Sequence, residues 1–211
     1  MKLTVFGATG GTGAHVVRLA LEAGYHVTAV ARDPARVDIH HDHLRVLRGD
    51  VLDFASVDQA VSGQDAVISC LGATGREKPI TIYSAGTDNI LRAMQASGVK
   101  RFLCISANPL VVGNGDALLD RLILKPIVRQ IFKESYADLR HMEAEVHRSD
   151  LDWTIMRPPR LLNRPPTGRY RVAFDRNLPH GRSIARADLA GALLRMLDDP
   201  KAIHAAVTVA Y

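Results

Sequence analysis

Short apolar runs alternate with longer amphipathic segments along the first half of the chain. Several runs are apolar throughout, which is typical of strands buried on both faces of a sheet. The segments between them repeat apolar side chains at helical spacing, as helices that cover a sheet do. The predicted strands lie at 3–6, 26–31, 44–48, 66–70 and 101–105, and the predicted helices begin after residue 10 and cover 55–61 and 81–97. This alternation predicts an α/β fold, a doubly wound parallel sheet joined by right-handed crossovers.

The second half of the chain shows the same pattern less regularly. A proline-rich segment covers residues 158–166 and shows no helical periodicity. The further predicted helices cover 116–133, 135–149 and 186–198, and the further predicted strands cover 152–156, 170–174 and 205–209, with 170–174 at a sheet edge. There is no internal repeat, and 211 residues suit one core of moderate size. We therefore expect a single domain over residues 1–211.

The turn between the first predicted strand and the first predicted helix is rich in glycine. Glycine lets the chain reverse tightly and lets a phosphate approach the backbone. The N-terminus of the following helix offers free N–H groups and a partial positive charge. The turn has the sequence Gly7-Ala8-Thr9-Gly10-Gly11-Thr12-Gly13, and Gly24 marks the expected end of the helix. This spacing in a strand, turn and helix context predicts dinucleotide binding through Gly7, Thr9, Gly10, Gly11, Thr12 and Gly13.

Two arginines follow the second predicted strand, where a dinucleotide fold meets the adenosine ribose. An acid at this place binds the 2′-hydroxyl of NAD, whereas an arginine accommodates the 2′-phosphate of NADP. Arg32 stands here, and Arg36 adds a second charge one turn further on. Asp33 could bind the ribose instead, although Pro34 fixes the turn behind it. We expect NADP(H) as the coenzyme; two plain surface charges are the alternative.

Further candidate residues follow the third and fourth predicted strands. Asp50 and Val51 would place a carboxylate and an apolar side chain near the adenine. Leu71 and Gly72 would let the chain pass close to the ribose and phosphate of the coenzyme. Because the carboxyl ends of parallel strands meet at one edge of a sheet, we expect these four residues to share the dinucleotide site.

Composition and charge indicate which compartment and which partners to expect. With 47% apolar and 23% charged residues, the chain is typical of a soluble globular protein. No apolar stretch is long enough for a membrane span and the first strand begins almost at the first residue, so we expect a cytoplasmic protein without a membrane partner. The net charge of +5 comes from scattered arginines without a DNA-binding motif, and we expect no nucleic-acid partner. Cys70 and Cys104 are predicted to be buried thiols, and the histidines at 40, 41 and 43 a solvated loop without a metal.

Taken together, the motifs resemble the atypical short-chain dehydrogenase/reductases with an NmrA-like Rossmann domain, and within them the flavin reductase or biliverdin reductase B type. The likeness covers nearly the whole chain. It rests on the glycine-rich turn and on segments at 23–28, 32–33, 49–52, 63–68, 158–159, 167–170 and 184–189. It implies a Rossmann-like sheet with helices on both faces. It also implies hydride transfer from NADPH to a flat small-molecule acceptor such as a flavin, a linear tetrapyrrole or a quinone-like molecule.

The resemblance assigns roles to residues near the expected acceptor. Ser106 matches the active-site serine of the family, where it would hydrogen-bond the nicotinamide amide or the substrate; a serine that caps a turn is the alternative. Pro158 matches the segment that lines the nicotinamide. Substrate specificity in this group lies in a region that corresponds here to about 108–135 and 158–182.

Two departures from familiar patterns affect the chemistry. The residue after the paired prolines is commonly histidine in the flavin reductase type and is Arg160 here. Arginine cannot act as an ordinary acid, so Arg160 would clamp an anionic acceptor or stabilise developing charge, with solvent as the proton donor; a surface arginine is the alternative. The Tyr-x-x-x-Lys pair of classical short-chain reductases is missing. Tyr136 and Arg140 have that spacing, but we expect Tyr136 to be a packing residue.

A second function remains open on the sequence alone. Some NmrA-like proteins keep the coenzyme fold and act as NADP-sensing binding proteins without turnover. Ser106 and Pro158 favour an enzyme, whereas Arg160 and the missing tyrosine and lysine pair leave the sensor open. The sequence indicates no oligomeric state.

Overall fold

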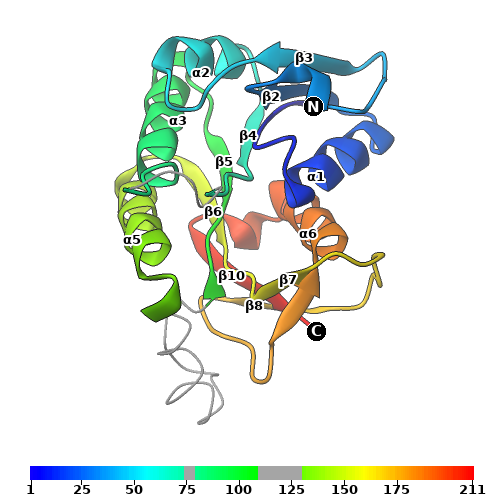
Figure 1. Ribbon diagram of the computed structural model, residues 1–211, viewed down its shortest axis with the longest axis vertical. Helices are drawn as coiled ribbons and strands as arrows, with labels where there is room; N and C mark the ends of the chain where they lie inside the picture. The colour runs from blue at the N-terminus through cyan, green and yellow to red at the C-terminus, as the bar shows by residue number, and fades with distance from the viewer. Residues whose placement is uncertain (74–78, 109–129) are drawn as a thin grey trace.

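The computed structural model describes residues 1–73, 79–108 and 130–211 (Figure 1). Eight strands form one sheet in the order β3-β2-β1-β4-β5-β6-β10-β8. They are β1 (Lys2–Phe6), β2 (His26–Ala31), β3 (Leu44–Arg48), β4 (Ala66–Ser69), β5 (Arg101–Ile105), β6 (Asp152–Met156), β10 (Ala205–Ala210) and β8 (Arg171–Phe174). All neighbours run parallel except β8, which pairs antiparallel with β10 at the sheet edge. The chain winds outward from β1 in both directions, as predicted for a doubly wound sheet.

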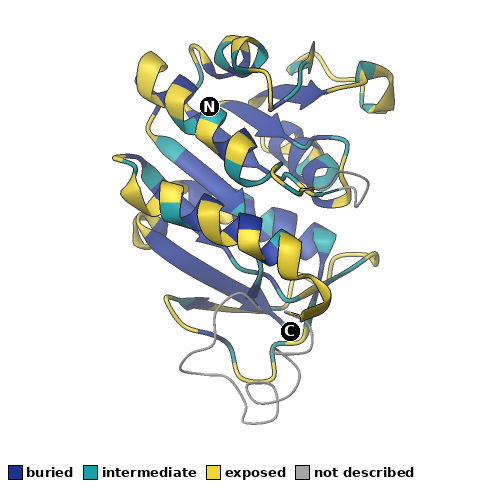
Figure 2. Ribbon diagram, turned by 60° about the vertical axis from the view of Figure 1, so that its left-hand side comes forward, coloured by how far each residue is buried: buried dark blue, intermediate teal, exposed yellow. Residues whose placement is uncertain are grey.

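Helices cover both faces of the sheet (Figure 1). One face carries α1 (Gly11–Glu22) and α6 (Arg186–Asp198), and the other carries α2 (Phe54–Val61), α3 (Ser84–Ser97) and α5 (Lys133–Arg148). Figure 2 shows the buried sheet between helices whose outer sides are exposed. Within the described ranges, no helix combines the length and the apolarity that a membrane crossing needs.

Strands that are apolar throughout explain why there are two cores. Successive side chains of a strand point to opposite faces, so a central strand needs apolar residues at every position. In β4, Val67 faces the layer of α2, α3 and α5, while Ile68 faces the layer of α1 and α6. Both side chains are fully buried. The continuous apolar pattern at 66–70 therefore predicted a strand buried on both faces correctly.

The predicted elements are confirmed wherever the structure describes them, with local corrections. The third predicted helix begins at Ser84 rather than residue 81, although the Ala85 N–H still donates to the Thr81 carbonyl at 2.9 Å. The Asp138 carboxylate accepts the N–H groups of Tyr83 and Ser84 at this end of the helix. The helix predicted at 116–133 falls largely on residues 109–129, outside the described part of the chain. The structure also contains a parallel pair, β7 (Arg160–Leu162) and β9 (Ser183–Ala185), that the sequence did not predict. Such short strands carry too little alternation to be recognised.

Candidate functional site

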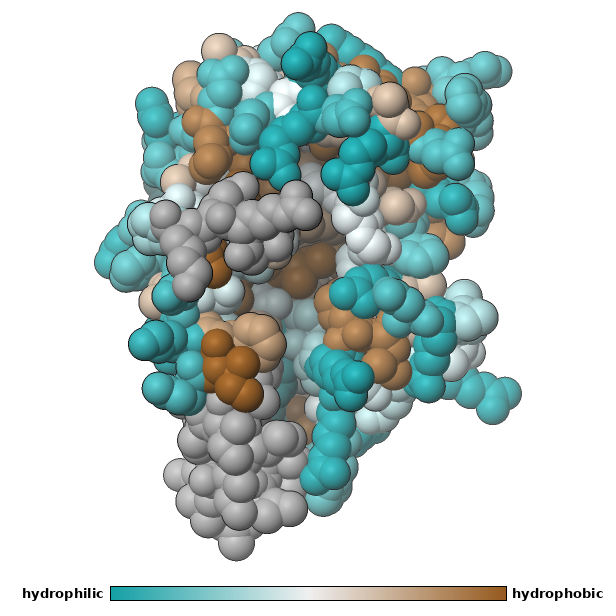
Figure 3. Space-filling view, viewed as in Figure 1, coloured by the Kyte–Doolittle hydropathy of each residue, from teal (hydrophilic) through white to brown (hydrophobic). Residues whose placement is uncertain are grey.

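The carboxyl ends of β1, β2, β3 and β4 open into one cavity of about 330 Å³, the coenzyme cavity. Figure 3 shows a hollow on this face with apolar residues at its floor. The predicted coenzyme residues that line the cavity are Gly7, Thr9, Gly10, Gly11, Thr12, Arg32, Arg36, Asp50, Val51, Leu71 and Gly72. Gly13 and Pro158 are not among the described lining residues. Gly13 is buried behind the turn, and the Pro158 carbonyl accepts the N–H of Asn108 at 2.9 Å.

The glycine-rich turn is held by contacts between backbones. Gly7 has φ +72°, and a Cβ at this position would lie 2.4 Å from the carbonyl oxygen of Cys70 at the end of β4. A Cβ on Gly13 would lie 2.1 Å from the carbonyl oxygen of Gly7. The N–H of Gly10 donates to that same carbonyl at 2.9 Å. The two glycines thus let β1, β4 and the start of α1 pack closely, which brings the N-terminus of α1 to the cavity.

The turn after β2 separates the roles of its charged residues. The Asp33 carboxylate accepts the N–H of Ala35 at 3.2 Å and caps the short 3₁₀ helix η1 (Pro34–Arg36). Asp33 does not line the coenzyme cavity, whereas Arg32 and Arg36 both do. The charged side chains that line this end of the cavity after β2, Arg32 and Arg36, are therefore both cationic, which favours an anionic group on the ligand.

The turn after β3 is closed by its own hydrogen bonds. The Asp50 carboxylate accepts the N–H of Leu52 at 3.0 Å, and the Ser56 hydroxyl donates to the Asp50 carbonyl at 2.8 Å. Val51 is buried, and its methyl groups occupy the space beside Gly86 in α3, where a Cβ would lie 2.9 Å away. The turn is thereby packed against α3.

A second cavity of about 650 Å³, the acceptor chamber, adjoins the first. Its described lining includes Tyr83, Ser106 and Tyr136. The residues that line both cavities are Leu71, Gly72, Ile105, Leu161 and Arg186. The two cavities therefore adjoin along these shared residues, and together they extend across the carboxyl ends of β3, β2, β1, β4 and β5.

Ser106 stands at the end of β5 and faces the acceptor chamber. Its N–H donates to the carbonyl of Met156 at 2.7 Å, which ties the end of β5 to the end of β6. Its residue is 6% exposed, and its Oγ has no hydrogen-bond partner among the described residues. A buried hydroxyl without a partner costs free energy, so this one is available for a ligand.

The structure does not bring every predicted residue to the site. Arg160 is exposed at the start of β7 and lines neither cavity, whereas its neighbour Leu161 lines both. Tyr136 is buried in the wall of the acceptor chamber, but Arg140 is exposed and outside it. Arg186 lines both cavities and was missed. The signal that could have found it is a cation at the first position of a helix, where the helix dipole disfavours positive charge.

Three buried carboxylates tie distant segments of the chain together, and the first is Asp138 in α5. It is 4% exposed and accepts the backbone N–H groups of Tyr83 and Ser84 and the hydroxyl of Ser84. The Tyr83 hydroxyl in turn accepts the N–H of Ala73 at 3.0 Å. Asp138 therefore positions Tyr83 and, through it, the segment that follows β4.

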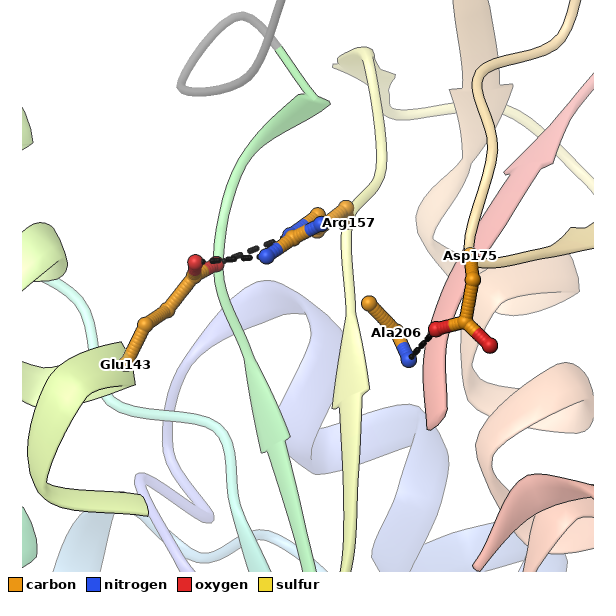
Figure 4. Close-up of polar contacts among 4 residues, drawn as sticks. All are labelled: Glu143, Arg157, Asp175 and Ala206. Carbon is orange, nitrogen blue, oxygen red and sulfur yellow. Dashed lines mark hydrogen bonds and ion pairs between the residues drawn. The ribbon is translucent and has the colours of Figure 1, made fainter. Parts of the chain in front are cut away.

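The second carboxylate, Glu143, pairs with Arg157 at the end of β6 (Figure 4). Nε and Nη2 of Arg157 donate to the two carboxylate oxygens at 3.0 and 2.7 Å. Both side chains are largely buried: that of Arg157 is 15% exposed and that of Glu143 is 8% exposed. This bidentate pair fixes α5 to the residue just before Pro158.

The third carboxylate, Asp188, lies in the first turn of α6 and is 3% exposed. It accepts the N–H groups of Thr167 and Gly168 and the hydroxyls of Thr167 and Tyr211. Burial alone would raise the pKa of Asp188, but these hydrogen bonds outweigh burial and hold its pKa below the ordinary value. The motif residues at 167–168 and 188 thus form one cluster that joins the proline-rich segment to α6.

Both cysteines are buried free thiols, as predicted. Burial raises the pKa of Cys70 to about 12 and raises the pKa of Cys104 as well. Both thiols therefore stay protonated near neutral pH, and neither provides a nucleophile to the cavities.

The fold and the two adjoining cavities define a dinucleotide-binding protein of the Rossmann type. The chain belongs to the NAD(P)H-binding family, whose model matches residues 7–200. A chloroplastic protein of Arabidopsis thaliana, itself uncharacterized, is 30% identical over 195 residues, which cover 88% of this chain and 68% of the relative. A 3 beta-hydroxysteroid dehydrogenase/Delta 5→4-isomerase of Mycobacterium tuberculosis is 32% identical over 123 residues. That match covers 53% of this chain and spans 33% of the steroid enzyme.

Solved structures show the same fold over the full chain. A short-chain dehydrogenase/reductase of Veillonella parvula in complex with NADP has a TM-score of 0.82 at 18% identity and covers 100% of this chain and 94% of its own. ChuY, an anaerobillin reductase of Escherichia coli O157:H7, has a TM-score of 0.82 at 22% identity. The match covers 100% of this chain and 97% of ChuY. The steroid enzyme, the short-chain dehydrogenase/reductase and ChuY are oxidoreductases by name, and one of these structures holds NADP.

Proposed function

We propose that this protein is an NADPH-dependent reductase that transfers hydride to a flat conjugated acceptor, such as a free flavin or a linear tetrapyrrole. One observation carries the proposal: two adjoining cavities extend from Arg32 and Arg36, past the glycine-rich turn, to the buried hydroxyl of Ser106. A dinucleotide in this space would have its adenosine phosphate at the arginines and its nicotinamide beside the acceptor chamber.

The reduced nicotinamide supplies the hydride when bound, so the chain itself has to bind, orient and exclude water. Ile105 and Leu161 offer apolar walls where the two cavities meet. Ser106 offers a hydroxyl to the nicotinamide amide or to the acceptor. Lys133 and Glu134, which line the chamber, are exposed to water, and we assign the proton that accompanies the hydride to solvent.

The test of the reaction is NADPH oxidation, followed by absorbance, with FMN, riboflavin, biliverdin and a simple quinone in turn. We expect turnover with at least one of these acceptors and a lower rate with NADH than with NADPH. Tight NADPH binding without turnover of any acceptor would contradict a reductase and would favour a coenzyme-sensing protein.

The test of the coenzyme is Arg32→Ala. Charge-assisted hydrogen bonds to a phosphate contribute about 1.5–3 kcal/mol, so we expect NADPH to bind roughly 10- to 100-fold more weakly and NADH to change by less than about threefold. Arg45→Ala, at an exposed position of β3, removes the same charge outside the cavity and is the control. Equal losses for the two coenzymes in Arg32→Ala would contradict the choice of NADPH.

A further inference from the structure

Arg186 is the first residue of α6 and follows β9 directly. A cation at this position faces the positive end of the helix dipole, and no side chain caps the helix at Ala185. A positive charge that works against its own helix is stabilised when an anion lies beside it. The helix α6 itself therefore does not explain why an arginine stands at this position.

The side chain of Arg186 runs along the glycine-rich turn. A Cβ on Gly11 would lie 2.7 Å from Cδ and 2.8 Å from Nε of Arg186. The missing side chain at Gly11 is thus the space through which Arg186 reaches the coenzyme cavity. Since Gly11 is also the first residue of α1, the guanidinium lies at the N-termini of two helices, α1 and α6. Three sources of positive potential converge there.

The described contacts of Arg186 leave its charge uncompensated. Nη1 donates to the amide oxygen of Asn163 at 2.8 Å, which orients the guanidinium without neutralising it. Asp188, the acid nearest along α6, is occupied by Thr167, Gly168 and Tyr211. Among the described residues, no carboxylate forms an ion pair with Arg186.

We propose that Arg186 binds the pyrophosphate of the dinucleotide, which it meets across Gly11 from the N-terminus of α1. This inference rests on the coenzyme placement in the proposed function and adds the residue that recognises the part shared by NAD and NADP. Under this proposal two cations bind two different groups of the coenzyme: Arg32 binds the 2′-phosphate and Arg186 binds the pyrophosphate. Arg186 also borders the acceptor chamber, so an anionic group of the acceptor is the other source of the same chemistry.

The experiment titrates the protein with NADP⁺, NAD⁺ and 2′-AMP by calorimetry, with no acceptor present. We expect Arg186→Met, which keeps an apolar stem, to weaken NADP⁺ and NAD⁺ by a similar factor of about 10 to 100 and to change 2′-AMP by less than about twofold. Arg32→Ala should show the opposite pattern, with losses for NADP⁺ and 2′-AMP but not for NAD⁺. Unchanged binding of NADP⁺ and NAD⁺ in Arg186→Met would overturn the proposal.

Two controls separate charge from structure. Arg18→Met, at an exposed position of α1, removes one positive charge from the same helix region and should leave all three dissociation constants within about twofold. Arg186→Lys keeps the charge and should recover most of the lost affinity for NAD⁺. A rise in the Michaelis constant of FMN but not of riboflavin, with coenzyme affinity unchanged, would assign Arg186 to the acceptor and overturn the pyrophosphate role.

Gly11→Ala provides an independent route, because its Cβ would push the Arg186 side chain away. We expect Gly11→Ala alone to weaken NAD⁺ binding. In a protein that already carries Arg186→Met, the same substitution should weaken NAD⁺ binding little further. Additive losses would contradict an action through Arg186. If Arg186→Met does not fold, unchanged NAD⁺ binding in Gly11→Ala alone would overturn the proposal. Because no acceptor is used, failure of the reductase assay alone would leave the Arg186 result intact.

Discussion

The two adjoining cavities, the coenzyme end and the acceptor end of the site, are built in different ways. The coenzyme end consists of turns that directly follow β1, β2, β3 and β4, and its geometry comes from backbone contacts such as that of Gly7 with Cys70. The acceptor end is held by buried side chains that connect distant elements: Asp138 with Tyr83, and Glu143 with Arg157. The difference suggests that the coenzyme end tolerates few backbone changes, whereas the acceptor end depends on a small number of carboxylates.

The largest effect should come from Gly7→Ala at the coenzyme end. The new methyl group would meet the Cys70 carbonyl and would impose a left-handed conformation on alanine, so we expect a loss of about 4 kcal/mol in the free energy of unfolding. Gly24 has a similar φ of +78°, but a Cβ there meets nothing within 4 Å. Gly24→Ala should therefore cost only about 1 kcal/mol. Equal losses in chemical denaturation would show that φ alone, and not the approach of β4, makes Gly7 necessary.

Glu143→Gln should give the next largest effect, at the acceptor end. It leaves the buried Arg157 without a charge partner, and we expect a loss of about 3 kcal/mol in the free energy of unfolding. Glu145 and Arg148, on the same helix, form an exposed pair at the same 2.7 Å distance, and Glu145→Gln should cost less than about 0.5 kcal/mol.

The same variant also tests whether the two ends are independent. In folded Glu143→Gln, we expect the affinity for NADP⁺ to stay within about threefold while the Michaelis constant of the acceptor rises. Replacing both Glu143 and Arg157 by methionine should recover much of the free energy of unfolding that Glu143→Gln loses, because no unpaired charge is then left buried. A coenzyme affinity that falls as much as acceptor binding would mean that the ends are not separable.

The contrast between local contacts at the coenzyme end and long-range contacts at the acceptor end also explains which parts of the site could be predicted from the sequence. The strands, the glycine-rich turn and Arg32 were recognisable because each depends on residues close together in the chain. The acceptor end was not, because its hydrogen bonds join residues such as Asp138 and Tyr83, 55 positions apart, that no local pattern connects. Pro158 and Arg160 were placed by resemblance, and the structure puts neither in a cavity wall. Arg186 was overlooked because a single arginine at a helix start is weak evidence without its contact to Gly11.

Asp188→Asn should have a smaller effect that depends on pH. Every described partner of this carboxylate is a donor, so the amide NH₂ of asparagine would face another donor, and we expect a loss of about 2 kcal/mol at neutral pH. The folded state lowers the pKa of Asp188, so its stabilising contribution is complete above the ordinary pKa and is lost as the pH falls through the lowered value.

The measurement for Asp188 is the free energy of unfolding of both proteins at several pH values. The difference between wild type and Asp188→Asn should be constant above about pH 5 and should shrink below about pH 4. Asp150→Asn, at an exposed position, should show no such difference. A difference that grows in acid would mean that the hydrogen bonds do not favour the charged carboxylate.

The smallest change in stability, and the sharpest functional one, should come from Ser106→Ala. Because the Ser106 hydroxyl is buried without a partner in the described structure, its removal should leave the free energy of unfolding unchanged or raise it by up to about 1 kcal/mol. Thr87 in α3 has a hydroxyl that is equally buried and unpartnered but lines neither cavity, so Thr87→Val is the matched control. We expect both variants to be as stable as wild type, and only Ser106→Ala to lose about tenfold in kcat/KM for the acceptor. Equal activity in the two variants would mean that the unpartnered hydroxyl of Ser106 is a packing feature and that the acceptor chamber orients its ligand by shape alone.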